Sequence, residues 1–93
     1  MKIYVVFLKH TDADFLDGHH PQIAYRNLQD AIQGSNNIFL DECERALYNV
    51  EVSGRTTLPM YLPDNGDGSY QMFYDNGGGL KEISTYIVSL DLM

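Results

Sequence analysis

The chain has 93 residues, of which 44% are hydrophobic, and its formal net charge is −7 at pH 7. This length and composition predict one folded domain over residues 1–93 and exclude a disordered chain. The excess of acidic residues would repel nucleic acid phosphates, so direct binding to DNA or RNA is disfavoured, whereas basic protein surfaces would be attracted. The acidic residues are scattered along the chain, which excludes an acidic tail.

Cysteine usage and hydropathy predict the compartment. Cys43 is the only cysteine, so no disulfide can form within the chain, and a reducing cytoplasm is the expected location. The first apolar run, residues 3–8, is too short for an export signal, and Lys9 ends it. No stretch approaches the roughly 18 apolar residues that a membrane span requires, so no membrane association is expected.

An apolar run and a helical period predict the first two elements. Residues 2–9 form a continuous run of β-branched and aromatic side chains, which is typical of a central strand buried on both faces. Pro21 suits the first turn of a helix, and the apolar residues of 21–33 recur on one arc at helical spacing. An alternative interpretation makes residues 22–26 a short strand and leaves only residues 27–33 helical.

A second helix is predicted over residues 38–48. Gly34 is a natural helix stop, and Asn36 or Asn37 can cap the start of a new helix. The apolar members of the segment share one arc; they are Phe39, Leu40, Cys43, Ala46 and Leu47. We therefore expect an antiparallel helix hairpin that buries Cys43 against a sheet.

The second half of the chain changes to strand and turn patterns. Residues 49–53 alternate apolar and polar side chains, which predicts a half-exposed strand. Pro59 limits residues 57–62 to an edge strand or an irregular segment. Turns rich in glycine, asparagine and aspartate are predicted at 63–68 and 75–79, and strands at 70–74 and 82–93.

Together these elements predict the α+β class. The expected architecture is a mainly antiparallel sheet of four to five strands with the N-terminal strand at its centre. The two-helix hairpin would pack on one face, in the order β-α-α-β-β-β-β.

All three histidines fall within one eleven-residue stretch that also holds three aspartates. They are His10, His19 and His20, with Asp12, Asp14 and Asp17. Such groups could supply three ligands to zinc or another divalent ion, or could form a pH-sensitive loop. However, adjacent histidines on an extended chain point to opposite sides, and the spacing matches no compact zinc signature. We predict a polar surface loop without a metal, and we expect no cofactor.

Two other patterns lack the residues that their chemistry requires. If Gly68 is aligned with the invariant glycine of an EF-hand calcium loop, Pro63 and Tyr74 occupy positions that need acidic residues. The segment 64–69 is therefore predicted to be a hairpin turn. Cys43 is surrounded by acidic residues, which would raise the pKa of its thiol and disfavour a nucleophile. We do not expect catalysis.

Aromatic content is the remaining signal, with seven tyrosines and four phenylalanines. Tyrosine beside glycine, serine and asparagine is typical of protein-binding surfaces, because its rigid ring gives contact area at low entropic cost. The ordinary enrichment of aromatic residues in strands is the alternative explanation. The candidate partner-binding residues are Tyr61, Asp64, Asp67, Tyr70, Tyr74 and Asp75.

These observations favour a small acidic protein-binding domain that occupies a basic surface of a larger partner. Tyrosines would be its anchors and carboxylates its steering groups. If that surface normally holds nucleic acid, the domain would act as an inhibitor by competition or mimicry. Small acidic proteins with which phages inhibit host nucleases or defence complexes offer an analogy of size, charge and composition only.

Two other classes of function compete with this hypothesis. The first is a metal-binding or small hydrolytic protein that uses the His10–His20 loop. The second is a structural homo-oligomer subunit, such as a homodimer, that forms when exposed sheet edges pair.

Overall fold

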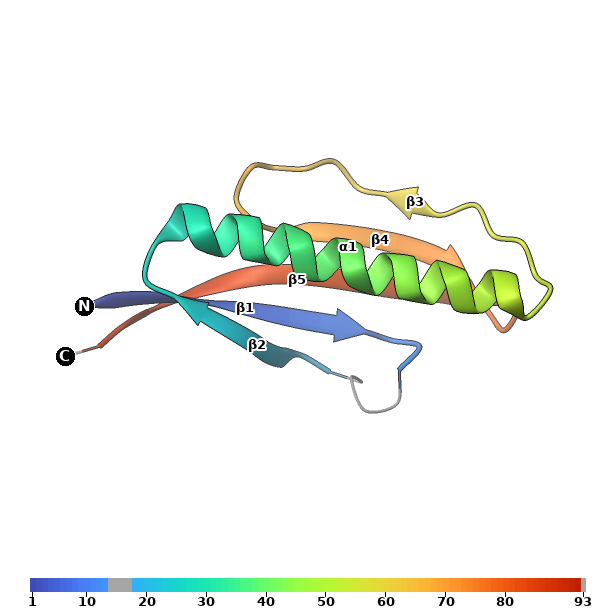
Figure 1. The fold of residues 1–93 in the computed structure, drawn as a ribbon, viewed down its shortest axis with the longest axis horizontal. Coiled ribbons are helices and arrows are strands. Elements are labelled where there is room, and N and C mark those ends of the chain that lie inside the picture. Colours follow the sequence, from blue (N-terminus) through green and yellow to red (C-terminus); the bar gives the residue numbers. More distant parts are fainter. Residues whose placement is uncertain (14–17, 93) are drawn as a thin grey trace.

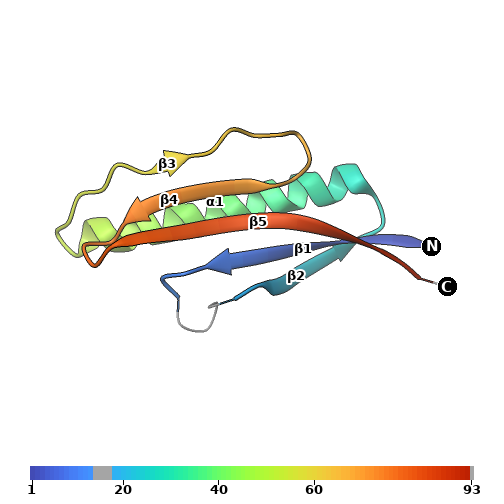
Figure 2. The same cartoon turned by 180° about the vertical axis from the view of Figure 1, so that it is seen from behind.

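The computed structural model describes residues 1–13 and 18–92, which form one antiparallel sheet covered on one face by one long helix (Figure 1). The strands are β1 (Lys2–His10), β2 (His20–Tyr25), β3 (Met60–Tyr61), β4 (Tyr70–Asp75) and β5 (Leu80–Asp91), and the helix is α1 (Leu28–Val52). The strand order is β2-β1-β5-β4-β3, and all neighbouring strands are antiparallel. Viewed from behind, the sheet lies in front of α1, and none of the described residues forms a helix on this second face (Figure 2).

The predicted α+β class and the antiparallel sheet are confirmed, but two finer predictions are wrong. The element order is β-β-α-β-β-β, with one helix in place of a hairpin. The centre of the sheet is β5, because this 12-residue strand pairs with β1 on one side and with β4 on the other. The N-terminal strand β1 is interior, between β2 and β5.

The segment 21–33, predicted as one helix, is divided between β2 and the start of α1. Pro21 lies in β2, an edge strand, opposite Phe7 at an irregularity in the register, and edge strands tolerate a missing N–H. Asn27 is the N-cap, because its side chain accepts hydrogen bonds from the backbone N–H groups of Gln29 (2.7 Å) and Asp30 (3.3 Å). The alternative interpretation is therefore correct in dividing the segment into a strand and a helix, but the strand is His20–Tyr25 and the helix does not end at residue 33.

The helix continues through the residues that were predicted to interrupt it. Gly34 is buried where Tyr25 of β2 packs, and a Cβ atom at this position would meet the Tyr25 ring. Glycine is thus used here for close packing and not as a helix stop. Asn37 accepts a hydrogen bond from the Gln33 side chain at 3.1 Å on the helix surface, so it does not cap a second helix.

The predicted strand over residues 49–53 is wrong, because α1 extends to Val52. The alternation of this short segment fits a helix as well: Val50 faces the core and Val52 faces solvent. The helix ends at Ser53, and Gly54 follows with a φ of 77°, a left-handed conformation typical of helix C-termini. The remaining strands and turns are confirmed with shifted ends; Met93 lies outside the described residues.

The core lies between α1 and one face of the sheet. Its buried apolar residues are Val6, Leu8, Ala31, Phe39, Cys43, Ala46, Val50, Met72, Tyr74 and Ile83. The predicted burial of Cys43 is confirmed, since the residue is 2% exposed. Leu40, which was predicted to share the apolar arc of the helix, is instead 50% exposed.

The predicted burial of the first strand on both faces is wrong. Val6 and Leu8 of β1 point toward α1 and are buried, whereas their neighbours Val5 and Phe7 point the other way and are half-buried. We call this second side the open sheet face. Its apolar residues include Ile3, Val5, Phe7, Ala24, Met60, Phe73, Leu80, Tyr86, Val88 and Leu90.

Candidate protein-binding surface

Four of the six predicted partner-binding residues come together beside the middle of α1. The rings of Tyr61 and Tyr70 both contact Phe39, with centroid distances of 6.3 Å and 5.6 Å. Burial first, and then the carboxylates of Asp64 and Asp67, raise the pKa of Tyr70 above its usual value. We call Tyr61, Asp64, Asp67 and Tyr70 the tyrosine–loop patch.

The loop of this patch is held by its own carboxylates. Asp64 accepts a hydrogen bond from the Gly66 N–H at 2.7 Å, and Asp67 accepts one from the Ser69 N–H at 2.9 Å. Such local bonds from aspartate to the backbone two residues on stabilise turns. Both aspartates are exposed, so the loop presents two fixed negative charges to solvent.

Tyr74 and Asp75 lie at the other end of β4, away from the tyrosine–loop patch. Tyr74 is 1% exposed, so it cannot anchor a partner, and this part of the prediction is wrong. The carboxylate of Asp75 is exposed and accepts a hydrogen bond from the Gly77 N–H at 2.7 Å in the turn to β5. Of the predicted anchors, Tyr61 is the one that is half exposed, at 50%.

A second surface on α1 was missed by the sequence analysis. Its residues are Leu40, Asp41, Glu44, Tyr48 and Glu51, all of them exposed, and we call them the outer helix face. Residues three or four apart share one side of a helix, which brings Tyr48 next to Glu44 and Glu51. Tyr48 is 64% exposed. The break predicted at Gly34 and the strand predicted from residue 49 concealed this continuous helix surface.

Both surfaces carry negative charge that the rest of the protein does not neutralise. Within residues 1–13 and 18–92, no ion pair involves any of the acidic residues Asp41, Glu44, Glu51, Asp64 and Asp67. The basic residue of the helix, Arg45, instead lies 3.5 Å from the buried carboxylate of Glu42. Tyr48 therefore lies among exposed carboxylates of α1, with the exposed Arg45 also beside it. The carboxylates of Asp64 and Asp67 lie near Tyr70, whose ring contacts the same Phe39 as Tyr61.

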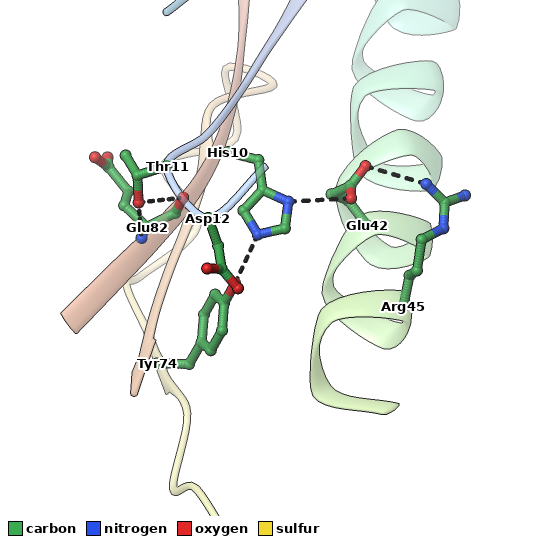
Figure 3. Close-up of polar contacts among 7 residues, drawn as sticks. All are labelled: His10, Thr11, Asp12, Glu42, Arg45, Tyr74 and Glu82. Carbon is green, nitrogen blue, oxygen red and sulfur yellow. Dashed lines mark hydrogen bonds and ion pairs between the residues drawn. The ribbon is translucent and has the colours of Figure 1, made fainter. Parts of the chain in front are cut away.

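A buried polar network links β1, α1 and β4 (Figure 3). His10 is 5% exposed; its Nδ1 lies 3.1 Å from Glu42 Oε1, and its Nε2 lies 2.6 Å from the Tyr74 hydroxyl. The same hydroxyl donates to Asp12 Oδ2 at 3.1 Å, and Asp12 also accepts from the Asn76 amide at 2.6 Å. His10 is thus a core residue at the end of β1, and its prediction as part of a polar surface loop is wrong.

This network holds β1, α1 and β4 together. Burial first, and then Asp12, raise the pKa of the Tyr74 hydroxyl well above its usual value, so the phenol stays protonated and is a poor nucleophile. No buried side-chain nitrogen or oxygen of the described residues lacks a hydrogen-bond partner. With both ring nitrogens engaged, His10 stabilises the contact of helix and sheet.

The other members of the histidine stretch are dispersed. Nδ1 of His19 lies 2.9 Å from the Tyr86 hydroxyl, and His20 begins β2. Asp14 and Asp17 lie outside the described residues. In the described part of the chain, no group of three histidine, cysteine, aspartate or glutamate residues is placed to hold a metal ion.

Cys43 has the properties of a packing residue. Burial, and then the neighbouring Glu42 carboxylate, raise the pKa of its thiol to about 12. At neutral pH the thiol is therefore protonated and shielded from solvent, which makes it unreactive.

A shallow cavity of about 1010 Å³ lies beyond the C-terminal end of α1. Leu58, Met60, Phe73 and Leu80 are among its lining residues. Small-molecule sites combine apolar walls with polar groups that converge on a ligand. Here the polar groups are already engaged in the turn between β4 and β5. Arg55 donates a hydrogen bond to the Asn76 carbonyl, and the Asp75 carboxylate accepts one from the Gly77 N–H.

No helix in the described part of the chain is long and apolar enough to cross a membrane. No protein-family model, curated protein or solved structure matches the chain.

Proposed function

We propose that the protein is a non-catalytic, acidic protein-binding domain that occupies a basic surface of a larger partner. The outer helix face and the tyrosine–loop patch would form the contact, with Tyr48 and Tyr61 as anchors. The acidic residues around them would steer the partner into place. Where the partner's basic surface normally holds nucleic acid, the domain would inhibit by competition, in a reducing cytoplasm that suits its single cysteine.

The observation that carries this proposal is the set of carboxylates without ion-pair partners, in the described part of the chain, on the two surfaces that also expose Tyr48 and Tyr61. On α1, leaving Asp41, Glu44 and Glu51 without ion-pair partners among the described residues gains nothing for the fold, because like charges on one helix repel one another. Tyrosine is enriched at the centres of protein interfaces, and acidic neighbours speed the approach of a basic partner. The contact of Tyr61 with Phe39 connects the loop to the helix, so both regions can reach the same partner.

A capture experiment tests the proposal. The protein is immobilised, and retention from a bacterial lysate is compared at about 0.05 M and about 0.5 M NaCl, since salt screens steering charges. We expect Asp41→Asn with Glu44→Gln to release the partner that the unmodified protein retains at low salt. Asp75→Asn with Asp91→Asn is the matched control, because it changes the net charge equally at exposed sites elsewhere.

Two results would contradict the proposal. If both double variants weaken retention equally, net charge alone explains the binding and the outer helix face has no special part. If the retained protein binds through an acidic or neutral surface, the partner is of another class.

A further inference from the structure

We propose that the open sheet face is the contact surface of a homodimer, in which two copies pack sheet against sheet with their helices outside. This inference goes beyond the proposed function, because it concerns the opposite side of the molecule (Figures 1 and 2). It rests on three properties of the open sheet face: its continuous apolar surface, its charge and its size.

The apolar surface follows β1 and β5 across the middle of the sheet. Three cross-strand pairs lie side by side along it: Ile3 with Leu90, Val5 with Val88 and Phe7 with Tyr86. The rings of the last pair are stacked, with centroids 5.3 Å apart. A sheet face that meets water normally carries polar side chains, and the half of this face around the three pairs lacks them. The polar residues of the face are gathered beyond Phe7 and Tyr86; they include Lys9, Gln71, Glu82 and Ser84.

The charge of this face favours a second copy over a basic partner. Its charged strand residues are Lys9 and Glu82, which pair with each other at 3.4 Å, and Asp75 at one end of β4. A basic partner would find almost no free carboxylate here. Two copies could meet through this nearly neutral face, because their unpaired acidic residues on α1 would stay outside. Two sheets packed about 10 Å apart would separate the helices by more than the Debye length of about 8 Å at physiological salt.

The size of the face also suits a dimer. The strands hold 9, 6, 2, 6 and 12 residues, each of which covers a strip about 3.3 Å long and about 4.8 Å wide. The projected area of the sheet face is therefore about 550 Å², and the corrugated surface of the side chains is larger. Stable interfaces bury about 800 Å² from each partner. A two-fold dimer places the same patch on both copies, so one apolar face suffices.

Analytical ultracentrifugation across micromolar to millimolar concentrations tests the proposal with the unmodified protein. We expect a species of twice the 10.6 kDa chain mass. Val88→Glu should place a charge in the centre of the interface and raise the dissociation constant at least 100-fold. Leu40→Glu is the matched control, since Leu40 is 50% exposed on the outer helix face, and this variant should remain dimeric.

Circular dichroism checks that each variant is folded. Leu90→Lys is a second variant on the same face. Because Leu90 is already 45% exposed, the fold should tolerate a charge at this position. The Leu90→Lys variant therefore tests the proposal even if Val88→Glu unfolds. A protein that stays monomeric at millimolar concentration would overturn the proposal. So would a dimer that Leu40→Glu dissociates while Val88→Glu and Leu90→Lys do not, because its interface would lie on the helix.

Discussion

His10 joins three elements through its two ring nitrogens, and no local pattern in the sequence indicates this role. Its partners Glu42 and Tyr74 lie 32 and 64 residues away along the chain. The apolar run of the first strand ends at Lys9, which places His10 outside the predicted strand. Because β1 extends one residue further, His10 shares the inward register of Val6 and Leu8. The network could therefore be recognised only after the strand pairing and the position of the helix were known.

The burial of His10 predicts a loss of stability when it is removed. His10→Ala should lower the free energy of unfolding by about 2–4 kcal/mol, because it leaves a cavity and removes a partner from both Glu42 and Tyr74. His19→Ala is the control; His19 is exposed, so its removal should change stability by less than about 0.5 kcal/mol. Urea denaturation measures both values. Equal stabilities of the two variants would mean that His10 is not buried in the network.

Cys43 predicts a fall in stability at alkaline pH. The thiol titrates near 9.0 in the unfolded chain and at about 12 in the folded protein. Between these values the folded state binds more protons, so the free energy of unfolding decreases as pH rises, by up to about 1.4 kcal/mol per pH unit for this group. Cys43→Ala should remove this contribution and give a shallower decline in urea denaturation between pH 9 and 10. If the free energy of unfolding falls equally steeply in the unmodified protein and in Cys43→Ala, the thiol has the same pKa in the folded and unfolded states.

At the scale of elements, periodicity predicted what packs against the sheet but not where the helix begins and ends. The arc of Phe39, Cys43 and Ala46 is correct because burial on one side imposes a helical period on the sequence. The break at Gly34 is wrong because a glycine that ends a helix and a glycine that accommodates a neighbouring side chain are identical in the sequence. Only the position of Tyr25, on a strand pairing with β1, distinguishes these two roles.

This explanation of Gly34 predicts a dependence on Tyr25. In an open helix position, Gly→Ala stabilises by about 1 kcal/mol through helix propensity. Here the added Cβ would meet the Tyr25 ring, so Gly34→Ala should destabilise the protein. In a Tyr25→Val background the same substitution should become stabilising. A double-mutant cycle by urea denaturation measures this coupling, and Asn37→Ala, exposed on the same helix, is the control that should not depend on Tyr25.

At the scale of the whole molecule, one helix and one sheet leave two different outer surfaces. The helix side exposes Tyr48, Tyr61 and carboxylates without ion-pair partners among the residues that the structure describes, whereas the open sheet face is nearly neutral and is apolar around the pairs from Ile3 to Phe7. The continuous apolar run of the first strand predicted burial on both faces, and only one is covered within the described chain. In a dimer formed through the open sheet face, that run would be buried as its composition indicates, and two acidic helices would point outward.

This arrangement predicts that charge and tyrosines act on different rate constants of partner binding. Asp41→Asn with Glu44→Gln should slow association and reduce its salt dependence, because steering charges act before contact. Tyr48→Ala or Tyr61→Ala should instead accelerate dissociation. If the ring is an anchor, the faster dissociation corresponds to a loss of about 2 kcal/mol of binding free energy. Surface plasmon resonance on the captured partner measures both rates, with Leu58→Ala as control, since Leu58 is 95% exposed away from both surfaces. A complex whose rates respond to Leu58→Ala, and to neither tyrosine, would place the interface beyond the C-terminal end of α1.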